Sequence, residues 1–139
     1  MPIKYNPQKG QILMCDFTKG FEVPEIVKER PVIVFKSSSR AKLVTIVPLS
    51  TVAPPEVHNF HMIVPNKELP NSAWFKNNES WLKGDMIYTV GWQRLSPVKM
   101  PRKNGKRAYY TGRISFDMLK NLEKCVLHGI GLGRLEKHL

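Results

Sequence analysis

The sequence has few of the residues that mark secreted, membrane-spanning or zinc-binding proteins. Its 139 residues include only two cysteines, Cys15 and Cys125, which lie far apart and form no C-x-x-C pair. Their number and spacing exclude a disulfide framework and a cysteine zinc site. No apolar run approaches the roughly 18–20 residues needed to cross a bilayer, and the opening MPIKYNPQKG lacks the apolar core of a signal peptide. We therefore expect a cytoplasmic protein with one domain, 1–139, and no membrane segment.

Acidic residues are scarce beside basic ones. Eleven Asp and Glu residues stand against 22 Lys and Arg residues, which gives a formal net charge of +11 at pH 7. An excess of this size favours a nucleic acid or an acidic protein as the partner. The hydrophobic share of 42% is high enough for the chain to fold around a modest core.

Familiar nucleotide, hydrolase and metal motifs are missing as well. The run GIGLG (129–133) follows a predicted helix instead of preceding one, and the sequence has no G-x-S-x-G. His58 and His61 lie three apart in a predicted strand without a cluster of Asp, Glu or Cys, so we expect surface or edge histidines on opposite faces. Cys15 is expected to be a small core residue. We predict no metal and no cofactor.

Short β-branched runs separated by Gly, Pro and polar clusters fill most of the chain. They predict five to seven strands, which we place at 10–17, 30–35, 43–50, 59–65 and, as one or two strands, within 81–95. Residues 36–42 are expected to form a polar hairpin loop, and 66–80 an irregular segment with about one helical turn. The loop at 18–29 is long for a compact domain, which is typical of functional or mobile loops.

The hydrophobic period changes after residue 115. Apolar residues then recur at spacings of three and four: Phe116, Leu119, Leu122, Val126 and Ile130. They predict one helix over roughly 116–128, with Ser115 as its N-cap and Gly129 as its C-terminal stop. The whole pattern indicates a mainly β protein, a small curved barrel-like sheet with a C-terminal α-helix packed on it.

A second feature is the basic segment at 99–110. Its Asn104-Gly105 pair is a strong signal for a two-residue hairpin turn. Four basic residues surround the turn, and two tyrosines follow it: Arg102, Lys103, Lys106, Arg107, Tyr109 and Tyr110. Cations for phosphates beside aromatic rings for bases suit single-stranded nucleic acid, so we predict RNA-binding roles for the four basic residues. The alternative is a hairpin tip that is basic only for solubility.

Charged residues at two places in the predicted strands are candidates for catalysis or anion binding. Lys83 and Asp85 lie two apart and would share a face of an extended segment, as an ion pair or as an acid–base pair. Arg30 stands at the entrance of a buried strand, where Pro31 follows it. A guanidinium fixed there can hold an anion through two parallel hydrogen bonds. The alternative is that Arg30 pairs with Glu22, Glu25 or Glu29.

The order of these short motifs resembles the MazF/PemK family of bacterial toxins. The resemblance runs from about residue 10 to residue 128 and rests on the following sequence: Gly10-x-Ile12-x-x-x-Asp16-Phe17, Gly20, Arg30-Pro31-Val32, Pro48-Leu49-Ser50-Thr51, Lys83-Gly84-Asp85, Ile87, Thr89-Val90 and the final helix. Each motif is weak alone, and the specificity lies in their order and spacing. Lys83 stands where a plasmid-borne branch of the family has Arg, and Ser50 where Thr is usual.

The resemblance implies a fold, an activity and a set of partners. The fold would be an SH3-like barrel of the CcdB/PemK type, and the activity metal-independent cleavage of single-stranded RNA. The partners would be a second copy in a homodimer and a cognate antitoxin that binds through an acidic C-terminal segment. The implied catalytic residues are Arg30, Ser50, Thr51, Lys83 and Asp85, and we add Lys28 to the expected RNA-binding residues.

Three functions remain open from the sequence. The first is an RNA-cleaving toxin, the second a non-catalytic relative of this fold that binds a protein such as DNA gyrase, and the third a basic nucleic-acid-binding module. Cleavage of bare RNA without added metal separates the first from the other two.

Overall fold

A computed structural model describes residues 2–139. It contains nine strands, two α-helices and three short 3-10 segments, in the order β1 (Ile12–Asp16), β2 (Glu29–Ser38), β3 (Leu43–Ser50), β4 (His61–Val64), η1 (Asn66–Glu68), α1 (Ala73–Asn77), β5 (Ser80–Lys83), β6 (Tyr88–Gly91), η2 (Trp92–Arg94), β7 (Leu95–Pro97), β8 (Lys99–Lys103), β9 (Lys106–Tyr109), α2 (Phe116–Gly129) and η3 (Gly133–His138). The predicted five to seven strands are too few, because segment 81–95 divides into three strands and the basic hairpin adds two.

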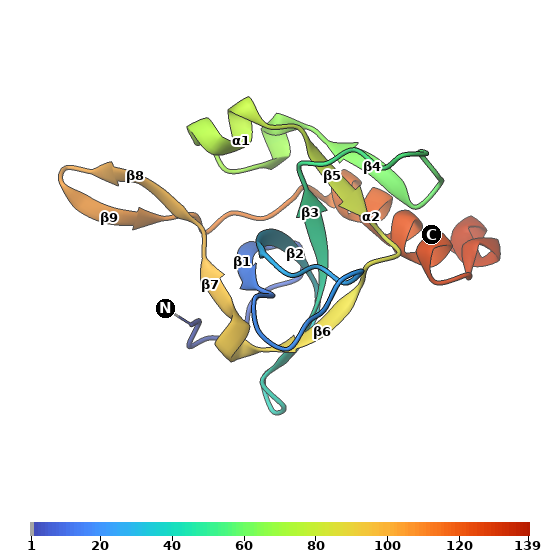
Figure 1. Cartoon of the computed structure of the whole chain (residues 1–139), viewed down its shortest axis with the longest axis horizontal. Coiled ribbons are helices and arrows are strands. Elements are labelled where there is room, and N and C mark those ends of the chain that lie inside the picture. Colours follow the sequence, from blue (N-terminus) through green and yellow to red (C-terminus); the bar gives the residue numbers. More distant parts are fainter. Residues whose placement is uncertain (1) are drawn as a thin grey trace.

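Seven strands form one antiparallel sheet that curls on itself (Figure 1). Its order is β4-β5-β3-β2-β1-β7, and β6 pairs with the first half of β3 while β5 pairs with its last two residues. Among residues 2–139, no pairing joins β4 to β7, so hydrogen bonds do not close the barrel. The expected curved β-sheet with a C-terminal helix is confirmed.

The centre of the sheet, formed by β2 and β3, is buried on both faces, which explains the continuous apolar runs of these two strands. Alternate residues enter two separate cores. Val32 and Val34 point into the curl of the sheet, where they meet Phe17 and Leu95. Ile33 and Phe35 face the side covered by α1 and α2. Cys15 lies in the inner core with no exposed surface, and burial raises the pKa of its thiol to about 12, as expected of a core residue.

Helix α2 begins as predicted at Phe116 and ends at Gly129, one residue later than predicted. The Ser115 hydroxyl accepts a hydrogen bond from the Met118 N–H, which confirms the N-cap. The stop is Gly131, whose φ of +81° allows its N–H to reach the His128 carbonyl while the Leu132 N–H reaches that of Leu127. This is the Schellman arrangement. Gly129, predicted as the stop after the helix, is instead its last residue.

The buried stripe of α2 also differs from the predicted one. Met118, Leu122, Cys125 and Val126 are buried, whereas Phe116 is 72% exposed. Phe116 is the first residue of the helix, and its ring lies under the Lys120 ammonium. No helix in residues 2–139 is both long enough and apolar enough to span a membrane.

The basic hairpin is a separate two-stranded sheet, β8-β9, that extends away from the curled sheet (Figure 1). Asn104 and Gly105 have φ values of 53° and 75°, which is the turn geometry that Asn-Gly favours. The hairpin prediction is therefore confirmed. The prediction of one helical turn within 66–80 is confirmed by α1.

Candidate functional site

Three cationic side chains line one cavity of about 300 Å³ at the entrance of β2. They are Lys28, Arg30 and Lys83, and the Ser50 side chain lines the same cavity. Residues 24–28 of the long loop, which was expected to be functional or mobile, form one wall of this cavity. The loop prediction is thus linked to a specific cavity.

Strand register explains why these distant residues meet. In the β2–β3 ladder Val32 is opposite Pro48, and continuing this antiparallel register by two residues places Arg30 opposite Ser50. On the other side of β3, Leu82 is opposite Leu49, which brings Lys83 next to Pro48 by the same step. Side chains that are opposite in antiparallel strands share a face, so the guanidinium, the hydroxyl and the ammonium converge.

Arg30 has no carboxylate partner. In the part of the chain that the structure describes, no Asp or Glu oxygen lies within 4 Å of its guanidinium, so the alternative of a pair with Glu22, Glu25 or Glu29 is wrong. Glu29 precedes Arg30 in the strand and therefore faces the other side of the sheet. Glu25 does line the cavity, but its carboxylate accepts the Glu22 N–H at 2.9 Å.

Of the two hydroxyl residues, Ser50 lines the cavity and Thr51 does not. The Ser50 Oγ accepts a hydrogen bond from the Val52 N–H at 3.1 Å, which fixes the hydroxyl at the end of β3. Thr51 follows the strand in a bend and does not line the cavity. The structure therefore brings Ser50 to the cations and leaves Thr51 outside the cavity wall.

Lys83 and Asp85 do not lie on one extended face. Lys83 ends β5, and a turn follows in which the Met86 N–H donates to the Lys83 carbonyl at 3.1 Å. Among residues 2–139 the two side chains form no ion pair with each other, so that interpretation is wrong. Lys83 and Met86 line the cavity, whereas Asp85 lies beside His61, with Oδ1 4.0 Å from Nε2.

His61 is the residue near this site that the sequence analysis dismissed. The surface prediction is correct for His58, but the His61 side chain is only 8% exposed. His61 Nδ1 accepts the His58 N–H at 3.1 Å, so a neutral ring carries its proton on Nε2, facing Asp85. Burial lowers the pKa of His61, and the Asp85 carboxylate partly offsets this effect.

The expected opposite orientation of the two histidines is also wrong. Strand β4 starts only at His61, and a turn before it brings the His58 ring to 5.7 Å from the His61 ring, between centroids. Three aromatic rings therefore cluster here, because the Phe60 ring packs against both histidines at 5.2 and 4.5 Å.

Helix α2 supports the turn that carries Lys83 and Asp85. A Cβ placed on Gly84 would lie 2.4 Å from the Cys125 carbonyl oxygen, and one on Gly129 would lie 2.4 Å from the Gly84 backbone. Helix and turn thus meet backbone to backbone, which only glycine permits. The Gly84 N–H also donates to the Phe60 carbonyl at 2.8 Å.

The four basic residues of the hairpin lie outside the cavity. Arg102, Lys103, Lys106 and Arg107 are exposed on β8 and β9, and the Arg102 guanidinium donates to the Gly105 carbonyl at 3.2 Å. They form a second cationic surface, continuous in sequence with Tyr109 and Tyr110.

A model of PemK-like, MazF-like toxins of type II toxin–antitoxin systems matches residues 8–128. The chain belongs to this toxin family. The family predicted from the order of the motifs is therefore confirmed.

This PemK-like toxin is similar to one curated relative and to several solved structures. The uncharacterized protein YifN of Escherichia coli K12 is 22% identical over 147 residues, covering 94% of this chain and 95% of YifN. MazF from Deinococcus radiodurans superposes with a TM-score of 0.61 at 16% identity, over 92% of this chain and 99% of that one. An endoribonuclease in complex with its cognate antitoxin, from a mycobacterial species, superposes with a TM-score of 0.56 at 17% identity, over 91% of this chain and 96% of that one. These structures show the shared fold.

The long loop of this toxin is held at its start by Arg94, which the sequence analysis did not single out. Its guanidinium donates to the carbonyls of Asp16 and Lys19, at 3.1 and 2.7 Å, and lies over the Phe21 ring at 4.6 Å. Phe21 in turn packs against Phe17 and Tyr88. The loop wall of the cavity is therefore anchored on the inner core.

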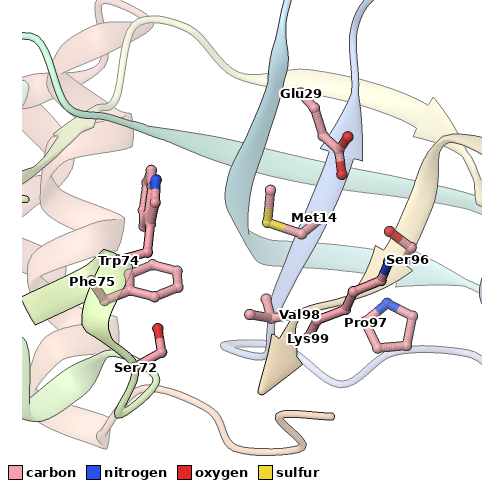
Figure 2. Close-up of a pocket in the computed structure, with 9 residues that line it drawn as sticks. All are labelled: Met14, Glu29, Ser72, Trp74, Phe75, Ser96, Pro97, Val98 and Lys99. Carbon is pink, nitrogen blue, oxygen red and sulfur yellow. The ribbon is translucent and has the colours of Figure 1, made fainter. Parts of the chain in front are cut away.

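A different cavity of about 280 Å³ lies between α1 and the strands β1 and β7 (Figure 2). Trp74 and Phe75 of α1 face Met14 and Val98 across it, and the Glu29 carboxylate is at its edge. The charged residues of this lining are the Glu29 carboxylate and the single cation Lys99, so it suits a polyanion less well than a lining with three cations. The cationic cavity at Arg30 is the better candidate for phosphate chemistry.

Within residues 2–139, no group of three or more His, Cys, Asp or Glu side chains is arranged to hold a metal ion. The cationic side chains named above are the groups at this site that can neutralise phosphate charge.

Proposed function

We propose that this toxin is an endoribonuclease that cleaves single-stranded RNA at short sequences and thereby inhibits translation and growth. The observation that carries the proposal is the convergence of Lys28, Arg30 and Lys83 beside the Ser50 hydroxyl in one cavity. Membership of the toxin family and the similarity to proteins named endoribonucleases support it.

The cavity fits the charge that develops when RNA is cleaved. Attack by a 2′-oxygen turns the phosphodiester into a phosphorane with additional negative charge. Arg30 is assigned to its non-bridging oxygens, because a guanidinium held by a strand can donate two parallel hydrogen bonds without reorganising. Ser50 and Thr51 are assigned to orienting the phosphate, and Lys28 to binding the RNA backbone. Since these cations supply the positive charge, the reaction needs no metal ion.

Two proton transfers complete the reaction. A base removes the proton of the ribose 2′-hydroxyl, the 2′-oxygen bonds to phosphorus, and the bond to the 5′-oxygen breaks as an acid protonates that oxygen. Lys83 is the proposed acid or a second cation, since it lines the cavity. The products are a 2′,3′-cyclic phosphate and a 5′-hydroxyl.

Asp85 is the proposed base, or the group that orients one. It lies one turn from Lys83 and outside the cavity wall, so the attacked ribose would lie across the Lys83–Met86 turn. The neutral His61 ring has its Nδ1 lone pair bonded to the His58 N–H and its Nε2 proton toward Asp85. We therefore assign His61 the role of positioning the Asp85 carboxylate.

The test is the cleavage of a short RNA in excess EDTA, with analysis of the new ends. We expect full cleavage, a 2′,3′-cyclic phosphate and a free 5′-hydroxyl. The same RNA with a 2′-deoxy sugar at the cut site should bind but stay intact. A 5′-phosphate product, or cleavage of the deoxy substrate, would overturn the mechanism.

The proposed partners follow from charge and family. We propose a homodimer, in which the RNA groove spans both subunits, and a cognate antitoxin whose acidic segment occupies that positive groove. One similar structure is described as a complex with a cognate antitoxin, and others as MazE–MazF, which supports an antitoxin partner. Sedimentation as a monomer at micromolar concentration would count against the dimer.

A further inference from the structure

A third cavity, of about 500 Å³, lies at the foot of the β8-β9 hairpin. The N-terminal segment forms one wall and residues 109–113, with Pro97, form the other. Three tyrosines, three side-chain amides and one arginine dominate its lining, and no lining residue is acidic: Tyr5, Asn6, Gln8, Gln11, Tyr109, Tyr110 and Arg113. Neither the proposed mechanism nor the family match assigns it a role.

The inner wall of this cavity is built by a hydrogen-bond network. Gln11, only 8% exposed, donates from Nε2 to the Tyr5 hydroxyl at 3.1 Å and accepts the Gln8 N–H at 3.2 Å. The Arg113 guanidinium donates to the Gln8 Oε1 at 3.0 Å, and a β-bridge joins Gln11 to Arg113. The two walls are therefore fixed relative to each other before any ligand arrives.

The groups left free are those that recognise a nucleobase. Tyr5 and Tyr109 are 44% and 42% exposed, so each offers a ring face for stacking. The Gln8 Nε2 keeps its donors, and the Asn6 amide has no hydrogen-bond partner among residues 2–139. The Tyr110 phenol is protonated and can donate at neutral pH, and burial raises its pKa further. Amide and phenol groups match the donors and acceptors on base edges.

The charge around the cavity favours a polyanion with bases over other ligands. Arg107 and Tyr109 are two apart in β9 and share a face, so the cationic hairpin leads directly to an aromatic ring. Arg113 brings a guanidinium into the cavity itself. An acidic peptide would use the cations but not the ring faces.

We propose that this cavity, which we call the tyrosine cavity, binds one nucleotide of the single-stranded RNA away from the cleaved bond. Its base stacks on Tyr109 or Tyr5, and the hairpin cations hold the adjoining phosphates. The proposal rests on RNA being the substrate, as proposed above. It adds a second contact that lengthens the RNA site beyond the catalytic cavity.

The experiment uses an RNA in which every 2′-hydroxyl is replaced by fluorine, so that it cannot be cleaved by the proposed route. Replacing some uridines by 5-bromouridine and irradiating the complex should attach the RNA to Tyr5 or Tyr109, identified by mass spectrometry. In anisotropy titrations, Tyr109→Leu should weaken binding about 5- to 100-fold through lost stacking. Tyr109→Phe, which keeps the ring, should bind like the wild type.

Trp74→Leu is the matched control, because Trp74 is an aromatic residue of similar exposure, 45%, in a different cavity. It should leave RNA binding unchanged. Adducts only outside the tyrosine cavity, together with wild-type affinity of Tyr109→Leu and Tyr5→Leu, would overturn the inference. The protein could also bind this RNA through the tyrosines and yet leave natural RNA intact. That result would support the inference and contradict the proposed cleavage.

Discussion

Arg30 keeps all of its N–H donors available at the mouth of a cavity. Among residues 2–139 its guanidinium has no hydrogen-bond or ion-pair partner, while its backbone is fixed in β2 opposite β1. Lys83 and Lys28 add charge but not a planar pair of donors, so the three cations are not equivalent. This difference ranks Arg30 first for transition-state stabilisation.

At the same scale, His61 predicts a pH dependence of stability. Because burial lowers its pKa in the folded state, the unfolded chain binds the proton more readily, and stability falls as pH drops below the ordinary histidine pKa of about 6.5. Asp85, His58 and Lys83 are the charged or titratable side chains around it. His61→Asn, whose amide oxygen can still accept the His58 N–H, should flatten this loss in urea unfolding between pH 7.5 and 5.

His58→Asn is the control for that experiment, because His58 is exposed and its ring is not enclosed. It should retain most of the wild-type slope, because burial is a larger cause of the lowered His61 pKa than the charge of His58. An identical pH slope in wild type and His61→Asn would show that His61 does not titrate as a buried ring.

At the scale of elements, the contact between α2 and the Lys83–Met86 turn depends on two glycines. Replacing an exposed glycine inside a helix by alanine usually raises the free energy of unfolding by about 0.5–1 kcal/mol. At Gly129 the sign should reverse, because the added Cβ would lie 2.4 Å from the Gly84 backbone. We expect Gly129→Ala to lose about 1–3 kcal/mol in urea unfolding, and to slow RNA cleavage by displacing the turn.

Asn121→Ala tests whether that loss is specific, since Asn121 is exposed in the middle of the same helix. It should stabilise the protein by a few tenths of a kcal/mol through helix propensity. Stabilisation by both variants would mean that helix and turn do not meet backbone to backbone.

The hairpin should contribute to RNA affinity mainly through charge. If RNA binding neutralises about four phosphates, the log–log salt slope is near −3 for a single strand. Replacing Arg102, Lys103, Lys106 and Arg107 by Ala should flatten that slope in anisotropy titrations. A slope unchanged from the wild type would show that the hairpin is not part of the RNA-binding surface.

The sequence predicted features that depend on neighbours in the chain better than features that depend on neighbours in space. Strand β3, the Asn104-Gly105 turn and the Ser115 cap are local and were predicted correctly. Strand β2 was also predicted, but its last three residues, 36–38, were assigned to the following loop. The role of Gly129 was predicted wrongly, because glycine is needed there for the close approach of the Gly84 backbone, which is distant in the sequence. His61 was misread because the turn that buries it is invisible to a period-2 pattern.

The site was predicted to the same extent. Arg30 and Lys83 were singled out from the local sequence and Ser50 from the family resemblance, and the register across three strands brings them together. The sequence could not show that Asp85 turns away from Lys83, because the turn is set by packing on α2. The roles of these residues stay predictions.

At the scale of the whole molecule, a net charge of +11 should make RNA and an acidic antitoxin segment compete. A peptide with the sequence of the acidic segment encoded by a neighbouring antitoxin gene should displace labelled RNA. Added salt should weaken the binding of both the RNA and the peptide. An equally long peptide with its acidic residues changed to amides should displace far less. Simultaneous binding of RNA and the acidic peptide at full affinity would contradict a shared groove.

The most direct test of the account is the single-turnover cleavage rate of Arg30→Ala beside that of Lys36→Ala. Lys36 is an exposed cation on the same strand, outside the cavity, so it controls for the loss of one charge from β2. With both variants shown to be folded by their thermal transitions, Arg30→Ala should cleave about 10²–10³-fold more slowly, and Asp85→Asn or Lys83→Ala should lose somewhat less. Lys36→Ala should stay near the wild-type rate. A folded Arg30→Ala protein that cleaves RNA at the wild-type rate would contradict the central claim.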